Sequence, residues 1–245
     1  MIADILTVAR KEWREYLLAG SGLKGGRAGL VIMLAVFGVF LPAQNGVDWL
    51  TSPAPLLAWS WVPLMLVSGV IADSFAGERE RHTLETLLAS RLPDAAILLG
   101  KVLAAVAYGW GFALLTGVLS LVTVNVVSWQ GRVVWFPALT LAAIPLFSFL
   151  TALLASAAGV LVSLRAPTAR QAAQMLSIAV MLILFVPIFG VRALPADTRA
   201  VLLGAVMGAG VTTLLAIVAA ALTAISAVLL WTAFLRFQRS KLSLD

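Results

Sequence analysis

The sequence DSFAGERERHTLETLLASRLPDAAILLGK, which runs from Asp73 to Lys101, separates two long apolar stretches. It holds five of the eleven acidic residues in a chain whose residues are 62% hydrophobic. An ionised side chain at the centre of a bilayer costs roughly 3 kcal/mol or more. We therefore expect this charged segment to be a loop in water that connects two membrane-spanning helices.

The composition predicts an all-α integral membrane protein. Only 11% of the 245 residues are charged, and the apolar stretches are too continuous for an ordinary soluble domain. The net charge of +6 does not indicate nucleic-acid binding, because the basic residues flank the apolar stretches and do not form one patch. The chain has no cysteine, which excludes a disulfide framework and a thiolate metal site.

Six apolar stretches are close to the roughly twenty residues that a helix needs to cross the hydrocarbon. They are residues 28–44, 54–74, 101–127, 136–163, 172–190 and 209–235. Glycines interrupt the region before the last stretch, and we expect a short extracellular or partly re-entrant helix at 200–208. The run from Ala152 to Gly159 consists mostly of small residues, which predicts close packing of the fourth span.

The distribution of basic residues predicts the orientation of the chain. If the N-terminus is cytoplasmic, fourteen of the seventeen lysines and arginines face the cytoplasm, and only Arg132, Arg192 and Arg199 lie outside. We therefore expect a multi-pass protein of the bacterial cytoplasmic (inner) membrane with both termini in the cytoplasm. Its expected parts are an N-terminal segment (1–27), a transmembrane domain (28–235) with a cytoplasmic loop (75–100), and a cytoplasmic tail (236–245).

The N-terminal segment has the pattern of an amphipathic helix that lies in the membrane interface. Apolar residues recur at helical spacing from Ile2 to Leu17, and charged residues occupy many of the other positions. We expect Trp13 and Tyr16 at the level of the lipid headgroups and the basic residues toward anionic lipid. Glycines between residues 20 and 26 predict a bend before the first span.

The charged loop itself predicts a short amphipathic helix. Leu84, Leu87, Leu88 and Leu92 recur at intervals of three and four residues, so they share one helical face. Pro93-Asp94 predicts the start of another helix, which can continue directly into the third span.

Three motifs in this segment resemble the pattern of type 2 ABC exporter permeases. They are Gly77-Glu78-Arg79-Glu80-Arg81, then Thr83-Leu84-Glu85 with Leu87-Leu88, and then Ile97-Leu98-Leu99-Gly100-Lys101. In that family the corresponding loop forms a cytoplasmic coupling helix that docks on the ATP-binding subunit. The resemblance therefore implies the permease subunit of an ATP-driven exporter. The sequence departs from the pattern at His82, where the family usually has a small residue such as glycine.

The resemblance also implies which residues couple the chain to the ATPase. They are Glu78, Arg79, Glu80, Arg81, Thr83, Leu84, Leu87 and Leu88. The leucines would fill a groove on the ATP-binding subunit, and the charged residues would pair around its rim. The charged residues could alternatively form intramolecular pairs that stabilise the loop, and the two roles are compatible.

The chain contains no visible energy source of its own. Asp73, Arg165 and Arg170 fall at the ends of spans, so no ion relay crosses the expected membrane interior. The phosphate-loop motif G-x-x-x-x-G-K-[ST] is missing, as are the hydrolase motifs H-E-x-x-H and G-x-S-x-G. We expect ATP and Mg to be bound by a partner subunit, and no catalytic, metal-binding or cofactor-binding residue in this chain, which would not be an enzyme.

Six spans are few for a translocation path. By resemblance, the functional unit has two permease subunits, most simply a homodimer, and two copies of the ABC ATP-binding subunit, all at the lipid membrane. The substrate stays open. Trp59, Trp61 and Trp110 are candidates for a substrate path, although belts of aromatic residues at the membrane interfaces explain most tryptophans of such proteins.

Two other classes of function remain as alternatives. One is a membrane scaffold or mechanotransducer that acts on a periplasmic partner, against which the short expected outer loops argue. The other is an intramembrane enzyme, against which the missing cluster of buried acid and base groups argues.

Overall fold

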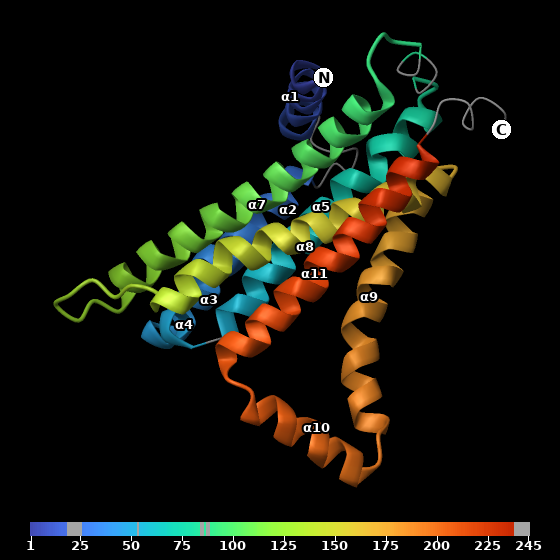
Figure 1. Cartoon of the computed structure of the whole chain (residues 1–245). Helices are drawn as coiled ribbons and strands as arrows, with labels where there is room; N and C mark the ends of the chain where they lie inside the picture. Colours follow the sequence, from blue (N-terminus) through green and yellow to red (C-terminus); the bar gives the residue numbers. More distant parts are fainter. Residues whose placement is uncertain (19–25, 53, 84–85, 87–88, 238–245) are drawn as a thin grey trace.

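The computed structural model describes residues 1–18, 26–52, 54–83, 86 and 89–237, apart from some side chains within the helices. Within these ranges the chain is built from helices and connecting turns, with no strand (Figure 1). The all-α class predicted from composition is therefore confirmed for the described part of the protein.

The described residues form ten α-helices and one π-helix. In chain order they are α1 (Ile2–Leu18), α2 (Gly26–Ala35), the π-helix η1 (Val36–Phe40), α3 (Leu41–Asn45), α4 (Val47–Thr51), α5 (Ala54–Glu80), α7 (Asp94–Val127), α8 (Ala138–Arg165), α9 (Ala169–Ala193), α10 (Ala196–Gly208) and α11 (Val211–Arg236).

Five helical stretches among the described residues are long and apolar enough to cross a membrane. They are Ala28–Asn45, Ala58–Glu80, Asp94–Val127, Ala138–Arg165 and Val211–Arg236. The expected span at 172–190 lies in α9, a helix of 25 residues that is not among these five. The sixth span therefore stays a prediction. The short helix expected at 200–208 lies within α10.

Different helices and connecting segments lie at the two ends of the helical bundle (Figure 1). At one end, which we call the junction end, lie α1, the C-terminal ends of α5, α8 and α11 and the N-terminal ends of α7 and α9, and α1 packs against α7. At the opposite, far end lie α4, the segment 128–137 and α10. The N-terminus and the end of α11 are therefore both at the junction end.

The first expected span contains a turn of π-helix. The five residues Val36–Phe40 widen the helix immediately before Pro42, which has no N–H to donate. The carbonyl of Gly38 accepts a hydrogen bond from Thr123 Oγ1 on α7 at 2.9 Å. The π-helix thus presents a backbone carbonyl to a neighbouring helix and ties the first span to α7.

Helices α5 and α8 form the closest packed pair at the centre of the bundle. The small residues of α8 that the sequence suggested for close packing are buried: Ala152, Ala155, Ser156, Ala157 and Gly159. A Cβ atom on Gly159 would overlap the side chain of Ile71 on α5. The predicted small-residue face is therefore confirmed, because the absent side chain of Gly159 lets the two helices touch.

A serine strengthens the same contact nearer the junction end. Ser163 Oγ on α8 accepts hydrogen bonds from the backbone N–H groups of Phe75 at 3.1 Å and Ala76 at 2.9 Å. It donates its own proton to the carbonyl of Ala72 at 2.9 Å. One hydroxyl thus binds the last turns of α5 from the side, and this positions the residues that follow.

The α5–α8 contact predicts a sharp cost for any added volume at Gly159. Gly159→Ala should lower the stability of the detergent-solubilised protein by about 1–3 kcal/mol, because overpacking forces a shift of one helix. The loss would be measured as a lower midpoint of thermal unfolding followed by size-exclusion chromatography.

Gly69→Ala on α5 is the matched control, since a Cβ atom there meets no atom within 4 Å. The added replacement Ile71→Ala should partly restore the midpoint of Gly159→Ala. An unchanged midpoint for Gly159→Ala alone would contradict the described packing.

Candidate functional site: a charged junction of helix ends

A buried lysine lies at the centre of the junction end. Lys101 on α7 is 1% exposed, and its ammonium donates to Glu12 Oε1 on α1 at 2.7 Å and to Glu78 Oε1 on α5 at 3.0 Å. It also donates to the carbonyl of Ser74 at 2.9 Å and lies 5.2 Å from the ring centroid of Phe75. Glu12 and Glu78 are 3% and 5% exposed. The lysine therefore joins three helices within the protein interior.

The residue before this lysine lets α1 come close enough. A Cβ atom on Gly100 would lie 2.6 Å from Val8 Cβ and 3.0 Å from the carbonyl oxygen of Ile5, so the backbone of α1 crosses α7 directly over this glycine. The Gly100-Lys101 pair thus has a structural role: the glycine admits α1, and the lysine binds its carboxylate.

A second lysine extends the network toward the surface. Lys11 Nζ lies 3.2 Å from Glu78 Oε1, 3.3 Å from Glu12 Oε1 and 3.2 Å from Glu15 Oε1. Partial burial alone would lower the pKa of the Lys11 ammonium, but the carboxylates of Glu12, Glu78 and Glu15 outweigh it and raise this pKa above its ordinary value. Lys11 therefore stays charged and balances the second buried carboxylate.

Arg79 binds the C-terminal end of α8. Its two terminal nitrogens donate to the carbonyl of Ala166 at 2.5 Å and the carbonyl of Leu164 at 3.0 Å. The last carbonyls of a helix lack partners within the helix, and the helix dipole favours a cation at this end. Arg79 supplies both a donor and the favourable charge.

Glu80 binds the N-terminal end of the next helix. Its Oε2 accepts a hydrogen bond at 3.1 Å from the backbone N–H of Ala169, the first residue of α9. Thr168 Oγ1 accepts from the N–H of Gln171 and so caps the same end. The negative charge of a carboxylate interacts favourably with the helix dipole at an N-terminus. Arg79 and Glu80 therefore hold the two sides of the short turn between α8 and α9.

Arg81 pairs within its own segment. Its Nη1 lies 3.2 Å from Asp73 Oδ2, and both side chains are half exposed. Gly77 lies between the two residues in sequence, and a Cβ atom there would overlap the Asp73 carboxylate. Gly77 thus leaves the space in which Asp73 reaches Arg81.

His82 ends α5 in a left-handed conformation. Its φ is +55°, its N–H donates to the carbonyl of Arg79, and the N–H of Thr83 donates to the carbonyl of Glu78. This pair of bonds is the Schellman arrangement, in which the left-handed position favours glycine. The left-handed backbone therefore explains why the family pattern has a small residue such as glycine here. Histidine is among the residues that tolerate this region better than most.

The predicted coupling residues divide into two groups. One group makes intramolecular contacts, which was the second role that the sequence left open: Glu78, Arg79, Glu80 and Arg81. Each of the four binds a residue elsewhere in the chain and not another member of the group. Thr83 lies at the end of the helix cap and donates through Oγ1 to the carbonyl of Glu78 at 3.3 Å. Leu84, Leu87 and Leu88 lie outside the described residues. Their docking role stays a prediction.

Helices extend into both sides of the segment 75–100. α5 continues to Glu80, beyond the expected end of the second span, and α7 begins at Asp94, where the sequence predicts a helix start. The reason is pairing: Glu78 and Lys101 neutralise each other, so both can be buried in helices. Pro93 precedes the first residue of α7, and this helix runs without a break to Val127, as its predicted start implied.

The aromatic residues of α1 contact the bundle, and their expected level at the lipid headgroups stays a prediction. Trp13 packs edge-on against Tyr108 of α7 with ring centroids 6.3 Å apart, and Tyr16 lies 5.7 Å from the same ring. Both rings thus contact the bundle, and α1 is fixed by protein contacts in addition to any contact with lipid.

The three tryptophans proposed for a substrate path do not lie together. Trp59 is 1% exposed and packs edge-on against Trp49 and Phe136 in a cluster near the far end. Trp110 donates from Nε1 to the carbonyl of Pro145 at 2.9 Å, and Trp61 packs beside the main core. Their role in a path stays a prediction, and packing accounts for the position of Trp59.

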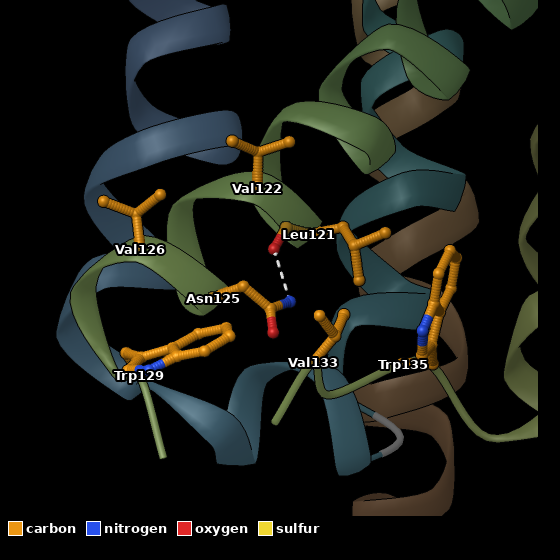
Figure 2. A pocket seen from close by; sticks show the side chains of 7 residues that line it. All are labelled: Leu121, Val122, Asn125, Val126, Trp129, Val133 and Trp135. Carbon is orange, nitrogen blue, oxygen red and sulfur yellow. Dashed lines mark hydrogen bonds between the residues drawn. The ribbon is translucent and has the colours of Figure 1, made fainter. Parts of the chain in front are cut away.

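An apolar hollow of about 570 Å³ lies at the far end of α7 (Figure 2). It is lined by Leu121, Val122, Asn125, Val126, Trp129, Val133 and Trp135. Asn125 exchanges two hydrogen bonds with the backbone of Val134, at 2.7 and 2.9 Å, and so holds the segment after α7 in place. Exposed tryptophans on opposite sides of this hollow are typical of residues at a membrane interface.

These features define a multi-pass helical membrane protein whose charged residues gather where five helix ends meet. A family model described as ABC-2 family transporter protein matches residues 64–197, more than half of the chain. The chain therefore belongs to the ABC-2 transporter family and is a membrane component of an ABC transporter. The family implies a transport subunit that works with an ATP-binding partner. No protein with a curated description matches the sequence significantly.

The Lys101 network predicts a specific pattern of stability. Lys101→Met removes the buried cation between Glu12 and Glu78 and leaves them only the half-exposed Lys11. Removal of one partner of a buried ion pair costs about 3–5 kcal/mol. We expect a strongly lowered midpoint of thermal unfolding in detergent. The triple variant Lys101→Met, Glu12→Gln, Glu78→Gln should recover most of the loss, because no buried charge is then left alone.

Arg132→Met, which removes an exposed cation in the segment between α7 and α8, is the control and should leave the midpoint unchanged. If Lys101→Met and Arg132→Met unfold at the same temperature as the unaltered chain, the network does not hold the junction end together.

Proposed function

We propose that this chain is the transmembrane permease subunit of an ATP-driven exporter, and that a separate subunit binds ATP with Mg and hydrolyses it. The segment 81–93, which connects α5 to α7, is the docking site for that subunit in this proposal. The family match over residues 64–197 supports it, since it covers this whole segment, all of α7 and most of α5.

One observation carries the proposal: the three residues Glu78, Arg79 and Glu80 bind three different sets of helices directly before the docking segment. Successive residues of an α-helix point about 100° apart, as 3.6 residues complete one turn. Glu78 therefore reaches α1 and α7, Arg79 reaches the end of α8, and Glu80 reaches the start of α9.

This arrangement can transmit movement. When two ATP-binding subunits close on ATP, a segment seated on one of them is displaced as part of a rigid body. Because α5 is joined to the segment by the chain, and because Glu78, Arg79 and Glu80 bind the neighbouring helices, a displacement at 81–93 acts on four further helices together. The charged residues would then work within the permease, while Leu84, Leu87 and Leu88 contact the ATPase.

The orientation and the assembly follow from the same proposal. ATP is found in the cytoplasm, so the junction end and both termini face the cytoplasm of a bacterium whose inner membrane the chain spans. Two copies of the ATPase need two docking segments, and a second copy of this chain supplies the other one. Substrate moves outward or leaves the inner leaflet. The substrate itself is left open.

The test is purification of the tagged chain from membranes in mild detergent together with an assay of ATP hydrolysis. An ATP-binding subunit should co-purify, and Leu87→Asp should release it. Arg79→Ala should keep the subunit bound but lower the stimulation of its ATPase activity by roughly five-fold or more, because a coupling of 1–3 kcal/mol is lost.

Trp129→Asp makes a comparable change from an apolar to an acidic residue at the far end and should keep the partner bound. Repeated purification without any ATP-binding subunit would contradict the proposal and favour the scaffold or the intramembrane enzyme. An Arg79→Ala variant with full stimulation would leave the partner in place but remove the role of the junction.

A further inference from the structure

The side of α1 that faces away from the bundle carries one row of residues that is apolar at the start of the helix and basic further along. Ile2 and Leu6 are 73% and 56% exposed and are one helical turn apart. Arg10 and Arg14 are exposed and follow with the same spacing of four residues. The opposite side of α1 holds Val8 and Glu12, which are buried against the bundle. The exposed side of α1 thus changes from apolar to basic along the helix axis.

A hollow of about 570 Å³ lies along the basic part of the row. Its lining residues are Thr7, Arg10, Lys11, Arg14 and Glu15. Three of these five side chains are cationic and one is anionic, which leaves the hollow with a net positive charge. A small anionic group is therefore the ligand of complementary charge.

The two arginines are the cations of this hollow that are free to bind a ligand. Lys11 lies within 3.3 Å of carboxylates of Glu12, Glu15 and Glu78. Among the described residues, neither Arg10 nor Arg14 has a carboxylate or carbonyl partner. Residues four apart are neighbours on a helix, and the planar guanidinium matches the oxygens of a phosphate group.

We propose that this hollow binds the phosphate of an anionic phospholipid from the leaflet at the junction end. Arg10 and Arg14 bind the phosphate oxygens, and Ile2 and Leu6 lie against the acyl region. A lipid fits better than free phosphate because the apolar part of the row continues from the basic part on the same exposed side of α1.

Glu15 pairs with Lys11 at 3.2 Å, so the two arginines carry the free positive charge of the hollow. Phosphatidylglycerol, whose phosphodiester carries one negative charge, is a lipid of this kind.

Binding of a lipid at this hollow would also affect the stability of the junction end. Lys11 lines the hollow and at the same time contacts Glu78, so an occupied hollow fixes α1 beside the ion pairs that hold α5 and α7. Anionic lipid would then stabilise the junction end. Binding of the lipid itself needs no ATP-binding partner, so this proposal and the proposed function can fail separately.

The experiment is native mass spectrometry of the full chain, purified without a partner and titrated with phosphatidylglycerol or with phosphatidylcholine of the same acyl chains. The first lipid should bind about 30-fold more tightly than the second, since each basic residue near an anionic surface contributes roughly five-fold. Arg10→Gln with Arg14→Gln should abolish the preference, and Arg10→Lys with Arg14→Lys should keep most of it.

The control is Arg192→Gln with Arg199→Gln, two exposed arginines near the far end, which should leave the preference unchanged. If the Arg10→Gln, Arg14→Gln variant prefers phosphatidylglycerol as strongly as the unaltered chain does, the site is overturned. Inorganic phosphate at millimolar concentration should not displace the lipid. Displacement would show a site for free anions and overturn the assignment to lipid.

Discussion

The junction end depends on the burial of one ammonium group, that of Lys101. A lysine at this depth is stable only if nearby groups replace water as hydrogen-bond acceptors and supply opposite charge. Glu12, Glu78 and the carbonyl of Ser74 do so from two other helices. The helices α1, α5 and α7 must therefore keep one arrangement. The close crossing at Gly100 is part of this requirement, because Lys101 reaches Glu12 only where α1 lies directly on α7.

The residues after Glu78 extend this order to the rest of the bundle. Arg79 and Glu80 have the charges that the dipoles of α8 and α9 favour at the ends they meet, a cation on terminal carbonyls and a carboxylate on a first N–H. Small residues make the contact possible, since Ala72 and Ala76 pack against Ala166 and Ala172 at the same turn. A short charged sequence in a membrane protein can thus serve as an internal connector in addition to any surface role.

Sequence reasoning predicted the class, the approximate positions of the described spans and the start of α7 at Pro93-Asp94, since these depend on local composition. It placed Glu78 in a loop in water, because its partners Lys11 on α1 and Lys101 on α7 are contacts that no local pattern reveals. The sequence shows that His82 stands where the family usually has a small residue. It does not show why, because the reason is the left-handed backbone at this position. The tryptophans were ambiguous for a similar reason: Trp59 has the same hydropathy in a packed cluster as in a translocation path, and only its neighbours Trp49 and Phe136 distinguish the two.

The central claim is that the junction passes movement of the segment 81–93 to the surrounding helices. The chain lacks cysteine, so spin labels can be placed at Ala3→Cys on α1 and Arg170→Cys at the start of α9, both exposed sites. The measurement is the distance between the labels by pulsed electron resonance, in complexes with the ATP-binding subunit, without nucleotide and with trapped ATP. The account predicts a distance that changes on ATP binding and a change that disappears when Glu78→Gln and Arg79→Ala are introduced. The same change in that variant would contradict it.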